Sequence, residues 1–301
     1  MTRSPLPQGK LFLTDSGLET DLIFNEGVDL PEFAAFPLLA EPEGRQRLRA
    51  YFLRHVAVAR RAGTGFVLEA PTWRANPDWG ARLGYDAAAL ATANRNAVEL
   101  LADLAEAYEG TDMPLSGCVG PRGDGYRPDE AMTAEQAQSY HQAQVEVFAE
   151  AGADLVTAMT MTTVAEGLGI ARAAARAGLP SVVSFTVETD GNLPDGTTLA
   201  DAVAAVDADT PPAHFMINCA HPDHFAERLS GAWTERVRGV RANASRRSHA
   251  ELDEATELDA GDPDELAREC ARLREVLPNL AVLGGCCGTD VRHVAAIAAA
   301  L

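Results

Sequence analysis

The chain reads LAVLGGCCG at residues 280–288, an apolar run that leads into two adjacent cysteines set between glycines. The run is short, rich in aliphatic residues, and shows no alternation of polar and apolar side chains. That pattern is typical of a β-strand that is buried on both faces, as strands are in the parallel sheets of α/β proteins. The stretch therefore predicts a buried parallel strand that ends at Cys286 and Cys287.

Similar runs recur along the chain and together predict eight buried strands, with a helical pattern after each. The predicted strands cover residues 10–17, 65–72, 114–120, 153–160, 181–187, 214–220, 236–243 and 280–288. The predicted helices cover residues 43–62, 87–108, 134–151, 164–177, 198–206, 222–230, 263–277 and 291–300. Capping signals support their starts, because Thr133 and Gln136 have the spacing of a capping box and Asp262-Pro263 reads as an N-cap followed by proline.

Eight strands that alternate with helices over 301 residues predict an α/β fold, a (β/α)8 TIM barrel that forms a single domain over residues 1–301. A doubly wound open sheet is the alternative, but the chain lacks the G-x-G-x-x-G fingerprint of its dinucleotide-binding form. Three long segments, 18–41, 73–86 and 244–261, follow strands, at the end where barrels carry active sites. We interpret the highly charged segment 244–261 as a solvated excursion or a subunit contact rather than a substrate lid.

The charge balance narrows the class of partner. The chain has 25 basic and 44 acidic residues, a net charge of −19, which argues against nucleic-acid and anionic-membrane partners. No apolar run is long enough to span a membrane, and the first residues contain no segment of signal-peptide type. Five cysteines, an odd number, do not suggest a disulfide framework. We therefore expect a cytoplasmic protein, and the sequence leaves a homo-oligomer open.

The cysteines at the strand ends predict a metal site. Cys219 ends the strand predicted at 214–220, and in a closed barrel the carboxyl ends of the strands share one rim with Cys286 and Cys287. Three thiolates with one open position are typical of catalytic Zn²⁺. We therefore predict that these three cysteines are the metal ligands and the catalytic residues. The alternative, that they are ordinary buried cysteines, is what we expect of Cys118 and Cys270.

Several motifs around these cysteines resemble a known family. They read INC at 217–219, GGCCGTD at 284–290, LTDSGLETDL at 13–22 and GCVGP at 117–121. The chain resembles the zinc-dependent homocysteine S-methyltransferase family, which includes betaine–homocysteine and S-methylmethionine–homocysteine methyltransferases, over nearly its whole length. The resemblance implies the same barrel, Zn²⁺ held by three cysteines, a small-molecule thiol acceptor and a methyl donor. It also implies substrate contacts at Asp15, Ser16, Gly17 and Asn218.

The chain departs from the family pattern in the acceptor site. The fourth strand of the family usually ends in Glu-Thr, and that glutamate holds the amino group of homocysteine, whereas this chain has Met159-Thr160. A neutral thioether does not pair with an ammonium group. The second predicted strand offers Glu69 as a replacement, with Thr72 and Arg74 just beyond it, and Arg74 would clamp an acidic group. The alternative is that Glu69 and Arg74 pair with each other at the rim.

These observations favour a zinc-dependent methyltransferase that moves a methyl group from a sulfonium, ammonium or similar donor to homocysteine or a related thiol. A zinc-dependent hydrolase or lyase is a second hypothesis, which requires an acid or base at the metal, for example His221 or Glu69. A non-catalytic binding subunit that contains zinc is a third.

Overall fold

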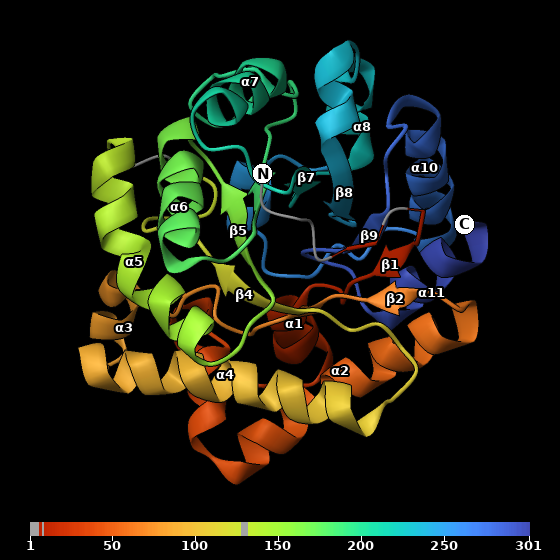
Figure 1. The fold of residues 1–301 in the computed structure, drawn as a ribbon. Coiled ribbons are helices and arrows are strands. Elements are labelled where there is room, and N and C mark those ends of the chain that lie inside the picture. The colour runs from red at the N-terminus through yellow and green to blue at the C-terminus, as the bar shows by residue number, and fades with distance from the viewer. Residues whose placement is uncertain (1–5, 8, 128–131) are drawn as a thin grey trace.

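The computed structural model describes residues 6–7, 9–127 and 132–301. Its strands form one parallel sheet that closes into a barrel, and the helices surround this ring (Figure 1). The strands are β1 (Phe12–Leu13), β2 (Gly65–Phe66), β3 (Leu68–Glu69), β4 (Leu115–Val119), β5 (Leu155–Met161), β6 (Ser181–Phe185), β7 (His214–Asn218), β8 (Val237–Ala242) and β9 (Val282–Gly285). Every predicted strand is confirmed. Each is shorter than its apolar run, and β5 ends at Met161, one residue beyond its predicted end.

The barrel closes through β2 and β3, which are two halves of one strand interrupted at Val67. The sheet order runs β2-β1-β9-β8-β7-β6-β5-β4-β3, so it begins and ends on the same stretch of chain. The Val67 amide donates to the Leu13 carbonyl at 2.8 Å, and the Leu68 amide donates to the Pro114 carbonyl at 3.0 Å. The stretch therefore bonds to β1 on one side and β4 on the other, and the barrel has the eight strands that the sequence predicts.

The helices confirm most of the predicted pattern and its caps. They are α1 (Leu18–Thr20), α2 (Pro42–Ala62), α3 (Pro77–Arg82), α4 (Ala87–Ala107), α5 (Ala134–Glu150), α6 (Val164–Ala177), α7 (Leu199–Asp209), α8 (Pro222–Phe225), α9 (His249–Asp253), α10 (Pro263–Val276) and α11 (Val291–Ala300). Thr133 and Gln136 form the capping box at α5. The helix predicted at 222–230 is wrong in extent, because α8 is one turn long and a 3₁₀ turn, Ala226–Arg228, follows it.

The interior of the barrel is apolar at one end and polar at the other. A small cluster, separate from the main core, draws on the beginnings of the strands and on the N-terminal segment: Leu6, Phe12, Val67, Leu155, Val182, Met216 and Val282. Further along the strands, inward positions are polar, with Glu69, Thr157 and Arg241 all buried. The apolar cluster therefore fills one end, and the polar groups lie toward the carboxyl ends of the strands.

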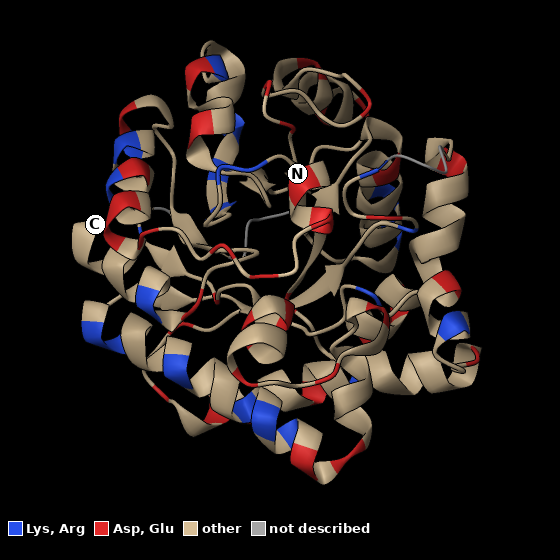
Figure 2. Cartoon of the chain, turned by 180° about the vertical axis from the view of Figure 1, so that it is seen from behind, with Lys and Arg blue, Asp and Glu red and all other residues tan. Residues whose placement is uncertain are grey.

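The surface carries charges of both signs, spread over the helices and the loops (Figure 2). Within the described residues, none of the helices has the length and apolar character needed to cross a bilayer.

Candidate functional site

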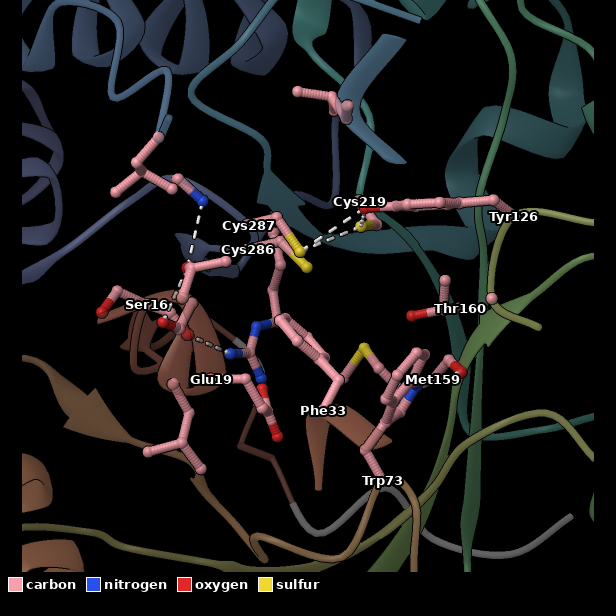
Figure 3. A pocket seen from close by; sticks show the side chains of 18 of the residues that line it. Ser16, Glu19, Phe33, Trp73, Tyr126, Met159, Thr160, Cys219, Cys286 and Cys287 are labelled. Carbon is pink, nitrogen blue, oxygen red and sulfur yellow. Dashed lines mark hydrogen bonds between the residues drawn. The ribbon is translucent and has the colours of Figure 1, made fainter. Parts of the chain in front are cut away.

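The three predicted cysteines meet at the carboxyl ends of neighbouring strands. Cys219 follows β7 and the Cys286–Cys287 pair follows β9, while β8 pairs with both strands. The Sγ atoms of Cys219 and Cys287 are 3.6 Å apart, and all three Sγ atoms lie within 4.8 Å of one another. Figure 3 shows the three side chains converging on one point. Chain segments that are distant in sequence thus form one cluster of thiols.

Close backbone packing holds the cysteine pair in place. A Cβ atom at Gly17 would lie 2.5 Å from the Cys286 carbonyl oxygen, so only glycine allows the β1 loop to approach this closely. Gly288, directly after the pair, has φ of +80°, a left-handed conformation that side chains disfavour. Gly17 therefore contributes a close contact to the cysteine turn rather than a side-chain group.

Asn218 organises the loop ends beside the thiols. Its Oδ1 atom accepts from the Thr160 amide at 3.0 Å and from the Ser184 hydroxyl at 2.6 Å, while its Nδ2 atom donates to Thr160 Oγ1 at 2.8 Å. Nδ2 also lies 3.9 Å from Cys286 Sγ. Thr160 and Cys219 both have positive φ, 62° and 55°, which is rare for residues with a Cβ atom. Asn218 is therefore well placed to fix these two turns.

Tyr126 and His249 complete the surroundings of the thiols, and sequence reasoning missed both. The Tyr126 hydroxyl lies 3.7 Å from the Sγ atoms of both Cys219 and Cys287. Its ring stacks on His249 at 4.2 Å between centroids. The Nε2 atom of His249 donates to the Cys219 carbonyl at 2.8 Å, and its Nδ1 atom contacts Glu188 at 3.0 Å. Neither residue stands in a recognisable motif, and only the folded loops bring them to the cluster.

The chemistry of the cluster suits a divalent cation. Hydrogen bonds from Cys219 and Cys287 lower the pKa of the Cys286 thiol, while hydrogen bonding to Cys286 raises the pKa of Cys219. The thiolate form of Cys286 is thus favoured, and its negative charge disfavours deprotonation of the neighbouring thiols. A divalent cation between the three sulfur atoms would remove this repulsion and favour all three thiolates. The donor set therefore fits a metal ion that binds three sulfur ligands.

The thiols lie in a cavity of about 350 Å³. Each of the three long segments after strands contributes to its lining, including Phe33 from 18–41, Trp73 from 73–86 and Leu258 from 244–261. Segment 244–261 is therefore not merely a solvated excursion, as the sequence suggested, because it forms part of the cavity wall. Met159 also lines the cavity, and Figure 3 shows its thioether among the side chains of this space.

Asp15 and Ser16 line the same cavity, but their polar groups are already occupied. Asp15 pairs with Arg241 at 2.7 Å and accepts a hydrogen bond from Tyr51 at 3.2 Å. The Ser16 hydroxyl contacts His55 Nε2 at 2.8 Å and Tyr51 at 3.1 Å, so its side chain packs against α2. The buried Arg241 is a third residue that sequence reasoning missed, after Tyr126 and His249.

Glu69 and Arg74 both line the cavity, and no ion pair joins them among the described residues. Glu69 accepts a hydrogen bond from Thr157 at 3.1 Å. The Arg74 guanidinium packs 3.6 Å from the centroid of the Trp79 ring and donates to the Gly123 carbonyl at 3.1 Å. The alternative in which the two residues neutralise each other is therefore wrong.

Two other candidates, Thr72 and His221, lie apart from the cavity lining. Thr72 donates to the Cys118 carbonyl at 2.7 Å, which ties its turn to β4. His221 caps α8, and its Nε2 atom faces Glu269 at 3.2 Å. Cys270 is buried on α10, which confirms the expectation that it is an ordinary buried cysteine.

Glu69 gives a prediction about stability. Burial raises its pKa from 4.5 to about 7. A raised carboxyl pKa favours folding of the protonated form, so this contribution is complete below pH 4.5 and is lost as the pH rises through 7. The Glu69→Gln variant has no such charge to bury. Its stability relative to the unchanged chain should rise between pH 5 and pH 8, by roughly 3 kcal/mol at most.

Urea unfolding at both pH values measures this difference. Glu106→Gln, on the exposed face of α4, is the control for loss of a carboxylate. A stability difference between Glu69→Gln and the unchanged chain that stays constant from pH 5 to pH 8 would contradict the prediction.

Comparison with known proteins places the chain in a family. A family model described as homocysteine S-methyltransferase matches residues 13–301. The chain belongs to the homocysteine S-methyltransferase family. A curated member, homocysteine S-methyltransferase of Escherichia coli strain K12, is 27% identical over 316 residues, which cover 99% of this chain and 97% of that protein.

Solved structures of the homocysteine S-methyltransferase family share the fold. The metallated form of the homocysteine methyltransferase MmuM from Escherichia coli superposes with a TM-score of 0.76 at 25% identity, covering 97% of this chain and 96% of that one. The oxidized form of MmuM gives a TM-score of 0.77 at 24% identity over the same shares. The (β/α)8 barrel predicted from the sequence is thereby confirmed, and the relative in its metallated form binds metal.

Proposed function

We propose that the chain is a zinc-dependent S-methyltransferase that moves a methyl group from a small sulfonium, ammonium or similar donor to homocysteine or a related thiol. The observation that carries this proposal is the convergence of Cys219, Cys286 and Cys287 in a cavity of about 350 Å³. Membership of the homocysteine S-methyltransferase family supports it. We further propose that the protein acts in the reducing cytoplasm, where the thiols stay free to bind metal.

The three cysteines would hold Zn²⁺, since three sulfur donors with room for a further ligand are typical of catalytic zinc sites. When bound, zinc supplies positive charge that favours the deprotonated form of an acceptor thiol at neutral pH. The chain's own part is to hold the acceptor sulfur beside this cluster and the donor methyl group in line with it.

The reaction itself is a displacement at carbon. The acceptor sulfur forms a bond to the methyl carbon while the bond from that carbon to the donor sulfur or nitrogen breaks, and the donor leaves as a neutral thioether or amine. Phe33, Trp73 and Met159 line the cavity and keep water from the reacting atoms. Aromatic rings also favour a cationic donor through cation–π attraction. These apolar walls thus suit a reaction in which the positive charge of the donor disappears.

The hydrolase or lyase alternative has weaker support. It needs a free acid or base at the metal. His221 points to Glu269 outside the cavity lining, so Glu69, which lines the cavity, is the one predicted acid or base that stays available to it. Three thiolates also donate much charge to zinc and weaken it as a Lewis acid for water. The non-catalytic alternative is disfavoured because the chain belongs to a family of enzymes.

A transfer screen tests the proposal. Zinc-loaded protein should be combined with S-methylmethionine, S-adenosylmethionine, betaine or dimethylated sulfur compounds as donors, and with homocysteine or other small thiols as acceptors. We expect about one zinc per chain by elemental analysis and a methylated thiol from at least one pair. Removal of zinc by a chelator should abolish that product, and readdition of zinc should restore it. Donor breakdown that proceeds without any thiol would support the hydrolase alternative instead.

A further inference from the structure

The floor of the cavity contains two buried groups of opposite charge from opposite parts of the sheet. Arg241 comes from β8 and Glu69 from β3, and both line the cavity next to the thiols. The two residues are 6% and 5% exposed. Buried charges are costly unless each has a partner, so every free polar atom in this pair indicates a place for a ligand group.

Arg241 has one side of its guanidinium engaged and one side open. Its Nε atom donates to the Gly285 carbonyl at 3.1 Å, and its Nη2 atom donates to Asp15 at 2.7 Å and to the Ser16 carbonyl at 3.1 Å. Nη1 makes no hydrogen bond to any residue that the structure describes. Because Arg241 lines the cavity, Nη1 is the donor that a ligand carboxylate would meet.

Glu69 has one free oxygen in the same floor. Its Oε1 atom accepts from Thr157, whereas Oε2 is buried and has no hydrogen-bond partner in the described part of the chain. Asp15, a second carboxylate of the cavity, is already paired with Arg241, and Glu19, which also lines the cavity, is only partly buried. Met159 offers no charge. Because Glu69 Oε2 is buried without a partner among the described residues, it is the acceptor that would gain most from a ligand ammonium group.

We infer that Arg241 and Glu69 bind the two charged ends of an α-amino acid thiol, with its carboxylate on Nη1 and its ammonium group on Oε2. The inference rests on the proposed function, and it names the residues of this chain that would hold the acceptor. It also explains how the site can bind an amino acid although methionine replaces the family's glutamate. The negative charge that binds the ammonium group comes from a different strand, and a buried arginine binds the carboxylate of the ligand. Arg241 and Glu69 influence each other's pKa, and both line the cavity without an ion pair between them in the described part of the chain.

Three thiols that differ by one group test this pair. L-Homocysteine carries both charges, 4-mercaptobutyrate lacks the ammonium group, and 3-mercaptopropylamine lacks the carboxylate. Glu69→Gln should raise KM about 10- to 100-fold for homocysteine and 3-mercaptopropylamine, as expected for loss of a charge-assisted hydrogen bond, and leave KM for 4-mercaptobutyrate unchanged. Arg241→Lys, which keeps the charge beside Asp15, should instead raise KM for the two thiols that carry a carboxylate. In both variants kcat should change little.

Two further variants separate ligand binding from a structural role. Glu166→Gln removes another buried carboxylate, which bonds to His141 outside the cavity lining, and should leave all three KM values unchanged. Met159→Glu should give little gain by itself but should restore homocysteine binding in the Glu69→Gln background. Rescue of this kind is not expected if Glu69 only stabilises the barrel.

Calorimetric titration of each thiol into zinc-loaded protein without a methyl donor distinguishes the two proposals. If methyl transfer fails with every donor while homocysteine still binds more tightly than both partial thiols, the proposed function is wrong and the amino acid site stands. If a methylated product forms but the three thiols bind equally well, the Arg241–Glu69 site is overturned. An equal loss of affinity for all three thiols in the Glu69→Gln variant would also overturn the Arg241–Glu69 site.

Discussion

Replacing Cys219 with alanine should abolish both metal retention and methyl transfer. The reason is geometric, because its Sγ atom is one of three that lie within 4.8 Å of one another, and two sulfur donors do not replace three. The loss of metal affinity and of activity should exceed the roughly 10- to 100-fold loss that follows when a group that only orients a metal ligand is removed. Cys286→Ala and Cys287→Ala should behave alike. Elemental analysis of the purified variants, together with methyl-transfer rates, measures both effects.

Cys270→Ala is the matched control for this series. Cys270 is as buried as Cys219, yet it lies on α10 and outside the cavity lining. Its variant should retain metal and activity, and thermal melts should show that all variants are folded. Full activity in any of the three cluster variants would refute the metal site.

Replacing Arg241 with methionine should cost about 3–5 kcal/mol of unfolding free energy, as is typical when one partner of a buried ion pair is removed. Asp15 would then be left as a charged group that is 4% exposed, and Tyr51 would be its one remaining side-chain donor among the described residues. The Gly285 and Ser16 carbonyls would lose a donor as well. Urea unfolding at neutral pH measures the loss.

The double variant Asp15→Asn with Arg241→Met supplies the control. Removing both charges avoids the unpaired carboxylate, so the double variant should be more stable than Arg241→Met alone. If the single and double variants were equally stable, or if Arg241→Met unfolded like the unchanged chain, the ion pair would not be the source of the effect.

Much of the fold followed from local patterns. Buried strands in a parallel barrel are continuous apolar runs, so each could be located from the sequence, and the capping signals at Thr133 and Asp262 marked true helix starts. The break at Val67 was not visible in sequence, because it reflects bonding to β1 on one side and β4 on the other. The short α8 was also missed, since four helical residues have the same composition as the start of a longer helix.

The candidate site was only partly predictable for a related reason. The three cysteines could be placed because each follows a strand, and strand ends of a closed barrel meet at one rim. Tyr126 and His249 lie in loops whose course depends on the whole fold, so their contact with the thiols carries no local signal. Arg241 stands inside a run that reads as a strand, and nothing in that run indicates that its side chain pairs with Asp15, 226 positions away.

The left-handed backbone at Thr160 and Cys219 limits how far the stability of this protein can be raised at these two positions. Such conformations cost side-chain-bearing residues roughly 1–2 kcal/mol each, and glycine would relieve the cost. At Cys219, however, glycine would discard the sulfur atom. Selection for heat tolerance and selection for turnover therefore act in opposite directions at that residue, and thermostable variants should gain their stability from other parts of the molecule.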